Sequence, residues 1–328
     1  MTDPEFTITC VATDRTRLFA TGEVSVPGCR VRMRFAEPEA IFREALNKKS
    51  FDITELSMSS HIITTARGDA DYIAVPVFLS RAFRHSAIFV RADAGITSLA
   101  QLKGAKIGLP EYQQTAAMWV RGMMADEGVR ASDVTWHVGG LNAPSEGERI
   151  ALKLPEDIVI SALAGADTLD DMLLAGQLDA IISPRVPASL QRGDPRIKRL
   201  YPDLRAAEVA YYQQTGFFPI MHALAVRKDV AADNPWLPKA LFDAFSTAKR
   251  MRQEEMALSN VLRVSLPWAG HDFNEAMQLT NNDPWPYGFA RNRTELDAMT
   301  QYMHADGTAV RKVDPAELFH PSTLTLSE

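Results

Sequence analysis

The sequence has little cysteine and no excess of basic residues, and each shortage argues against a class of protein. Only two of the 328 residues are cysteine. Cys10 and Cys29 have neither CxxC spacing nor neighbouring histidines, which argues against a disulfide framework and a zinc site. The 35 basic and 41 acidic side chains include no Lys/Arg stripe at helical spacing. We therefore expect no nucleic-acid partner.

Long apolar runs are also missing. A membrane-spanning helix requires roughly 20 consecutive apolar residues, and a candidate such as Tyr72 to Leu79 is interrupted by Pro76. The segment Met1 to Phe6 carries two acidic residues where a secretory signal would have a basic stretch followed by an apolar run. We expect a soluble, cytoplasmic protein with no membrane partner.

None of the common catalytic motifs occurs. The sequence has no glycine-rich phosphate loop, no GxSxG elbow, no HExxH motif and no His/Cys cluster with metal-binding spacing. A motif search alone therefore indicates no particular reaction or cofactor. A divalent metal held by His85, Glu111 or His222 stays open, although no ligand spacing demands one.

The pattern that is present is an alternation of strands and helices. Strands are predicted over 6–11, 51–53, 72–78, 86–90 and 106–109, and amphipathic helices over 38–47 and 114–127. This alternation predicts an α/β fold with mainly parallel sheets, in which ligands bind at the carboxyl ends of the strands. Because 328 residues exceed the usual size of one hydrophobic core, we expect two lobes with a ligand cleft between them.

Basic residues follow two of these predicted strands. Arg15 lies in a predicted loop over 14–17, and Arg81, Arg84 and His85 lie between two further strands. Arginine forms bidentate hydrogen bonds to carboxylates, each worth roughly 1.5–3 kcal/mol when protected from water. This concentration favours a carboxylate ligand. The alternative is that these arginines are solvated or pair with nearby acids.

Polar side chains follow other strands in the same way. The segment 111–115 joins a strand to a helix, so its backbone amides and hydroxyls lie at a helix N-terminus, where an anion can bind. The alternative is that Thr115 only caps that helix. Ser57, Ser59 and Ser60 end another strand and could bind either a ligand or the local backbone, and His222 interrupts a strand-like segment. A histidine in such a position can equally be structural.

Several stretches of the sequence resemble the 4,5-dihydroxyphthalate decarboxylase family, and the similarity extends over nearly the whole chain. The resembling stretches are 51–60, Phe83-Arg84-His85-Ser86, 109–113 with Thr115-Ala116-Ala117, Ile182-Ser183-Pro184-Arg185, 218–222 and Trp285-Pro286-Tyr287-Gly288. Two departures stand out. His61 occupies a position where we expect a tyrosine, and Arg185-Val186-Pro187 replaces a more proline-rich continuation. We expect both to line the cleft.

The resemblance implies a type II periplasmic-binding-protein-like fold with a discontinuous first lobe. The boundaries that follow are 1–92 and 211–328 for the first lobe and 93–210 for the inserted second lobe. It also implies cofactor-independent decarboxylation of a hydroxylated phthalate, most simply 4,5-dihydroxyphthalate to protocatechuate and CO2. The alternatives are a non-catalytic binding protein for an aromatic carboxylate and a lyase acting on a related aromatic acid. A homo-oligomer is possible.

A mechanistic hypothesis for this reaction assigns roles to site residues. We predict His85 as the proton donor or hydroxyl partner, with Glu111 as its acid/base complement from the opposite lobe, and the reverse assignment of the two stays open. The predicted carboxylate clamps are Arg15, Arg84 and Arg185. The residues predicted to orient the ring substituents of a small aromatic dicarboxylate are Ser59, Gln113, Thr115 and His222.

Overall fold

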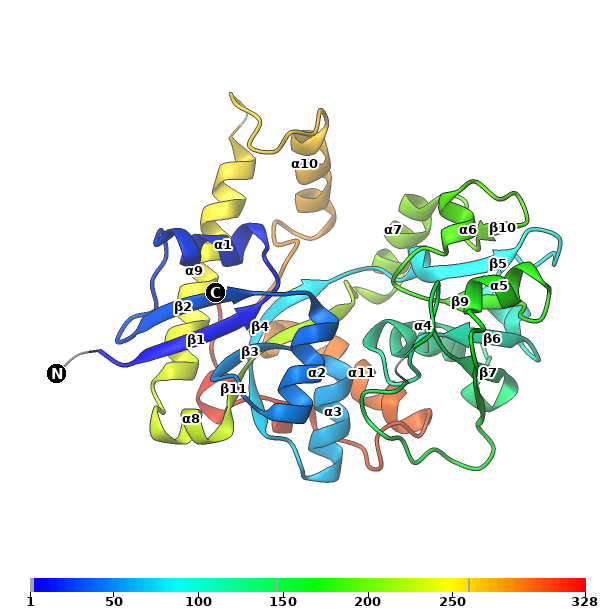
Figure 1. Ribbon diagram of the computed structural model, residues 1–328. Helices are drawn as coiled ribbons and strands as arrows, with labels where there is room; N and C mark the ends of the chain where they lie inside the picture. The colour runs from blue at the N-terminus through cyan, green and yellow to red at the C-terminus, as the bar shows by residue number, and fades with distance from the viewer. Residues whose placement is uncertain (1–2, 146, 259) are drawn as a thin grey trace.

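Two β-sheets organise the chain into two lobes, each covered by helices, in the computed structural model (Figure 1). The structure describes residues 3–145, 147–258 and 260–328. This architecture confirms the predicted two-lobed α/β fold. Among the described residues, no helix combines the length and the apolar character that crossing a bilayer requires.

The first lobe holds a five-stranded sheet of order β2-β1-β3-β11-β4. Its strands are β1 (Glu5–Cys10), β2 (Arg30–Phe35), β3 (Ile53–Ser57), β4 (Tyr72–Arg81) and β11 (Ile220–Arg227). Its helices are α1 (Asp14–Thr21), α2 (Pro38–Lys48), α3 (Met58–Arg67), α8 (Lys228–Asp233), α9 (Leu237–Ala257), α10 (Ala269–Leu279) and α11 (Arg293–Ala305). Strand β11 runs antiparallel to both β3 and β4, and the rest of the sheet is parallel.

The second lobe holds a six-stranded sheet of order β10-β5-β9-β6-β7-β8. Its strands are β5 (Ile88–Arg91), β6 (Lys106–Leu109), β7 (Thr135–Val138), β8 (Val159–Ala162), β9 (Ala180–Ile182) and β10 (Ile197–Arg199). Its helices are α4 (Thr115–Asp126), α5 (Leu169–Leu174), α6 (Ala188–Gln191) and α7 (Leu204–Thr215). Here β5 is the reversed strand. In each lobe, therefore, the first strand after the chain enters from the other lobe runs antiparallel to its neighbours.

Two segments connect the lobes, residues 82–87 between β4 and β5 and residues 216–219 between α7 and β11. The predicted boundaries at 92 and 210 lie close to these crossings, although β5 already pairs within the second sheet. Helix α4 adds a third connection, because its Trp119 packs in the core of the first lobe and its Val120 in that of the second. The Trp119 indole N–H also donates to the Ile220 carbonyl at 2.8 Å.

The prediction of a loop over residues 14–17 is wrong, because α1 begins at Asp14. The Thr13 side chain accepts a hydrogen bond from the Thr16 backbone N–H, and the Thr16 hydroxyl accepts one from the Thr13 N–H at 2.7 Å. This reciprocal cap satisfies two helix-terminal donors and starts the helix directly after the strand. Arg15 therefore lies in the first helical turn.

The expectation that His61 lines the cleft is also wrong. Its ring lies inside the first lobe on α3, fully buried, and its Nε2–H donates to the Leu318 carbonyl at 2.7 Å. Burial lowers the pKa of His61 to about 4, because a charged imidazolium loses its hydration there.

Acidification should therefore destabilise the fold through His61. The unfolded chain binds the His61 proton with an ordinary pKa near 6.5 and the folded chain only near 4. The stability contributed by the neutral ring is complete above pH 6.5 and is lost as the pH falls toward 4. At pH 5 the loss amounts to about 2 kcal/mol.

Urea unfolding at pH 7.5 and pH 5 measures this loss. His61→Gln keeps a donor for the Leu318 carbonyl but cannot titrate, so its stability should fall less than that of the wild type by about 2 kcal/mol. Equal falls for the two proteins would contradict the assignment to His61.

Candidate functional site

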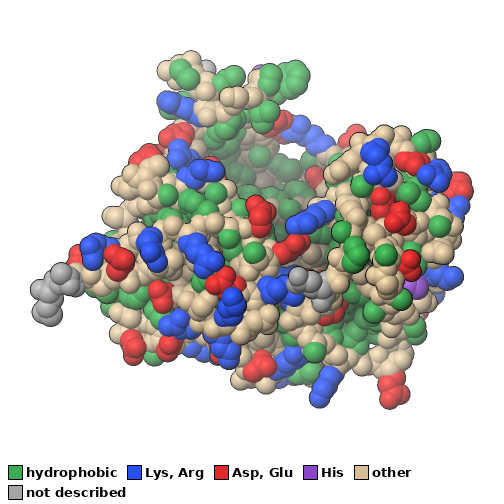
Figure 2. All heavy atoms as spheres, viewed as in Figure 1, with side chains coloured by type: hydrophobic (Ala, Val, Ile, Leu, Met, Phe, Trp, Pro, Cys, Tyr) green, Lys and Arg blue, Asp and Glu red, His purple; other side chains and the backbone are tan. Residues whose placement is uncertain are grey.

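A cavity of about 250 Å³ lies between the lobes, and we refer to it as the central pocket. Figure 2 shows the surface hollowed between the two lobes, below α10. The cavity is formed where β3 ends, where α2 and α4 begin, and where the chain crosses between the lobes. Its polar lining residues include Ser57, Arg84, Gln114, Thr115, Arg149, Arg185 and His222. The carboxyl ends of β3, β6 and β9 therefore point toward one cavity, as expected for α/β sheets.

Arg84 offers the central pocket an unpaired positive charge. Its guanidinium is half-buried and forms no ion pair with a described residue, and its Nε contacts only the Met221 sulfur at 3.3 Å. Burial lowers the pKa of Arg84 to about 10, so the group stays cationic at neutral pH. A buried cation without a counter-ion favours binding of an anion.

Two further polar groups in the pocket wall lack partners among the described residues. One is Nη1 of Arg149, a donor, and the other is Oε1 of Gln114, an acceptor. Arg149 is held in place because its Nε donates to Glu111 at 2.8 Å. The pocket is thus lined by two arginines, Arg84 and Arg149, and by Gln114, each with unused hydrogen-bonding capacity, which matches a ligand with acidic groups and a hydroxyl donor.

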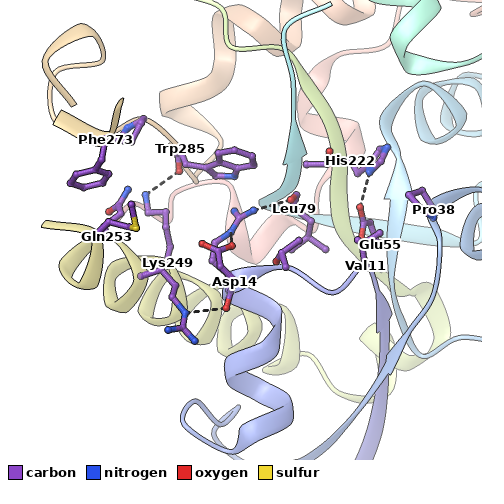
Figure 3. Close-up of a pocket in the computed structure, with 16 residues that line it drawn as sticks. Val11, Asp14, Pro38, Glu55, Leu79, His222, Lys249, Gln253, Phe273 and Trp285 are labelled. Carbon is purple, nitrogen blue, oxygen red and sulfur yellow. Dashed lines mark hydrogen bonds and ion pairs between the residues drawn. The ribbon is translucent and has the colours of Figure 1, made fainter. Parts of the chain in front are cut away.

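His222 lies on β11 beside Glu55 of β3, and its Nδ1 is 2.6 Å from the Glu55 carboxylate (Figure 3). The second carboxylate oxygen of Glu55 accepts the Val11 backbone N–H at 2.8 Å, which fixes its orientation. A carboxylate at Nδ1 holds the Nδ1–H tautomer, so Nε2 is the nitrogen left for proton exchange. Phe42 packs edge-on against the ring at 4.7 Å.

Hydroxyl groups connect the lobes at the base of the pocket. Thr115, at the start of α4, is within 2.9 Å of both Ser57 and Ser59. Its hydroxyl oxygen also accepts the Ser59 backbone N–H at 3.2 Å. Thr115 and Ser57 line the pocket, so this cluster both joins α3 to α4 and presents hydroxyls to a ligand.

A larger cavity of about 450 Å³ adjoins the central pocket through Pro38 and His222, which line both, and we refer to it as the α9 pocket (Figure 3). Its cations are all paired. Arg15 donates to the Tyr287 hydroxyl at 2.7 Å and to the Leu79 carbonyl at 3.0 Å, and Lys249 donates to Asp283 at 3.1 Å. Arg252 donates to the Asp14 carbonyl at 3.1 Å. The α9 pocket therefore offers an anion less than the central pocket does.

Comparison with known proteins places the chain in a family. A 4,5-dihydroxyphthalate decarboxylase from Comamonas testosteroni is 43% identical over 312 residues, which cover 95% of this chain and 94% of the relative. The chain belongs to the 4,5-dihydroxyphthalate decarboxylase family. A second member, from Pseudomonas putida, is 45% identical over 204 residues, which cover 62% of this chain and 79% of that protein.

The same decarboxylase-family chain has the architecture of transport-associated binding proteins. Residues 22–145 match the family of periplasmic substrate-binding proteins of phosphonate ABC transporters. The periplasmic aliphatic sulphonate binding protein SsuA from Escherichia coli superposes with a TM-score of 0.55 at 14% identity, covering 98% of this chain and 99% of that one. At that identity the likeness shows the fold alone.

The structure brings four of the nine predicted site residues of this family member into the central pocket: Arg84, Thr115, Arg185 and His222. Arg185 lies at the rim, largely exposed, and its guanidinium pairs with Glu39 of the opposite lobe at 2.8 Å. Arg15 lines the α9 pocket instead. Ser59 lies behind Thr115, in contact with it.

His85 and Glu111, the predicted catalytic pair, do not line the central pocket. His85 is buried in the second lobe, with the Tyr201 and Tyr211 rings at 5.0 and 5.2 Å, and burial lowers its pKa to about 4. Glu111 lines a neighbouring cavity and binds Arg149 and the Gln113 side-chain amide. Gln113 is fully buried and accepts from Ser60 at 2.9 Å. Their catalytic and binding roles stay predictions.

Sequence reasoning did not single out Arg149, Glu55 or Gln114. Arg149 comes from the irregular stretch after β7, where no periodic pattern gives the direction of a side chain. Glu55 carried one signal, since it lies between the apolar residues Ile53 and Leu56 in a short strand, where a carboxylate requires a buried partner. Within the described ranges, no group of three or more His, Cys, Asp or Glu side chains is arranged to hold a metal ion.

Proposed function

We propose that this chain decarboxylates 4,5-dihydroxyphthalate to protocatechuate and CO2 in the central pocket. The 43% identity over 95% of the chain to a curated decarboxylase of that name carries the proposal. The chemistry of the pocket supports it, because two guanidinium groups, an amide acceptor and a carboxylate-bound histidine suit a dihydroxylated dicarboxylate.

In the proposed complex the two arginines hold the substrate carboxylates. Arg84 binds one carboxylate with its unpaired guanidinium, and Arg149, which lines the same pocket, binds the other. Gln114 accepts a hydrogen bond from a ring hydroxyl, and the Ser57 and Thr115 hydroxyls contact the second. Glu111 acts as a positioning residue through its bond to Arg149, and Arg185 with Glu39 closes the rim.

The proposed reaction replaces a carboxylate with a proton. Protonated His222 donates the Nε2 proton to the ring carbon that carries the leaving carboxylate, while the para hydroxyl supplies electron density. The new C–H bond forms, the bond to the carboxylate breaks, and its electron pair restores the aromatic ring as CO2 departs. Each turnover consumes one proton, which solvent returns to His222. Glu55 stabilises the protonated His222 ring until the ring donates its proton to the substrate.

The decisive experiment incubates chelator-treated protein with 4,5-dihydroxyphthalate and follows both CO2 and protocatechuate. We expect equal amounts of both without added metal, as cofactor independence requires. Turnover only after a divalent metal is restored would contradict that part of the proposal. Substrate binding without product would favour the solute-binding alternative, and turnover of a different aromatic acid would point to a related lyase.

We also propose a cytoplasmic location, which the free state of both cysteines supports, because oxidising compartments favour disulfides. The same assay on fractionated cells tests it, and activity released with the periplasmic fraction would contradict it.

A further inference from the structure

One surface of the molecule carries most of its exposed large apolar side chains. Six of the ten such side chains in the described part of the chain lie between residues 258 and 268. They are Leu258, Val261, Leu262, Val264, Leu266 and Trp268. We refer to these six residues as the apolar tip. Scattered apolar residues are normal on a protein surface, but a contiguous group marks an interaction site.

The apolar tip stands at the far end of the hairpin formed by α9 and α10, beyond the sheets of both lobes (Figure 1). Figure 2 shows hydrophobic side chains gathered on this projecting part of the molecule. The first turns of α10, next to the tip, are tied to the second lobe, because Arg205 of α7 binds Asp272 at 3.0 Å and Glu275 at 2.7 Å. The six side chains of the tip remain between 41% and 70% exposed, so much of their apolar surface is left uncovered by the rest of the chain.

The size of the apolar tip meets the requirement for a symmetric dimer. Trp268 is 70% exposed, Leu266 63% and Leu262 59%. At roughly 150 Å² or more per large apolar side chain, the six exposed portions present on the order of 500 Å². Two tips together would remove roughly 1,000 Å² from water, the lower bound for a specific protein interface.

We propose that the apolar tip is the docking surface for a second copy of this chain. An isologous contact requires a self-complementary surface, and an apolar patch satisfies that requirement. Between residues 258 and 268 the only charged residue is Arg263, which forms no ion pair with any described residue. No opposite charge therefore selects a different partner. The inference concerns assembly and does not depend on the proposed decarboxylation.

Sedimentation velocity on the full chain over about 1 to 100 μM tests the proposal. We expect the wild type to sediment as a dimer or a larger assembly, and Leu262→Glu/Trp268→Glu to raise the dissociation constant at least about 100-fold. Val310→Glu is the matched control, because Val310 is 56% exposed and lies outside the tip. It should assemble as the wild type does.

A wild type that stays monomeric at the highest concentration would overturn the proposal, as would a double variant that assembles normally. A monomer that sediments with anionic phospholipid vesicles would instead assign the tip to a membrane surface. If circular dichroism shows that the double variant is unfolded, Ser265→Cys replaces it, with Val310→Cys as its control. An interchain disulfide confined to Ser265→Cys would support docking at the tip, and its absence would overturn it.

Discussion

Replacing His222 with glutamine should lower kcat by about 10²–10⁴-fold, the usual contribution of a positioned general acid. Glutamine keeps a polar side chain beside the Glu55 carboxylate but cannot carry the proton to the ring carbon. The substrate carboxylates are bound elsewhere, at Arg84 and Arg149, so the substrate dissociation constant should change little. Stopped-flow binding and steady-state CO2 release separate the two effects.

The same measurements on His85→Gln decide between two proton donors. His85 is the donor predicted in the sequence analysis, whereas the structure places its ring against Tyr201 and Tyr211. We expect His85→Gln to retain far more activity than His222→Gln. The reverse order would return the acid role to His85. His271→Gln is the control, because His271 is exposed on α10 and should behave as the wild type.

Replacing Arg84 with methionine should lower kcat/KM by about 10²–10³-fold, mostly through weaker substrate binding. Methionine keeps much of the apolar stem but removes a charge that forms no ion pair with a described residue. Two charge-assisted hydrogen bonds to a carboxylate are worth roughly 1.5–3 kcal/mol each away from water. Arg84→Lys should recover only part of the loss, because an ammonium group cannot form the bidentate contact. Isothermal titration with substrate measures the binding component.

Arg185→Met tests whether the predicted clamps are equivalent. Arg185 is largely exposed and already paired with Glu39, so its removal should cost much less binding than removal of Arg84. Arg192→Met, at another exposed position, should have no effect. Equal losses of substrate affinity for Arg84→Met and Arg185→Met would mean that Arg185 leaves Glu39 and binds the substrate carboxylate.

Local pattern explains why much of the fold could be predicted. Alternating side chains such as Phe6, Ile8 and Cys10 are buried on β1, and Pro38 occupies the first turn of α2. The prediction failed for residues 14–17, where a helix cap determines the structure. The Thr13–Thr16 cap begins α1 at Asp14 in place of the expected loop, and Arg15 in the first turn of this helix contacts Leu79 and Tyr287.

The candidate site was predicted only in part, for a reason visible in three residues. Arg84 and His85 are neighbours in the sequence, yet Arg84 faces the central pocket and His85 faces two tyrosines. No periodicity distinguishes their directions, because they lie in the crossing between the lobes. Arg149 enters the pocket from an irregular segment and is oriented by Glu111, 38 residues away.

The sequence by itself determined the alternation of strands and helices, the two-lobed α/β class and the membership of a decarboxylase family, since each depends on local spacing or on similarity along the chain. The tertiary structure alone decided which charges stay unpaired. A guanidinium is available to bind substrate only if its donors are not already hydrogen-bonded to other groups of the protein. That depends on contacts between residues far apart in the chain. Arg15 donates to the Tyr287 hydroxyl and the Leu79 carbonyl, whereas Arg84 forms no ion pair with any described residue and keeps its charge for a ligand.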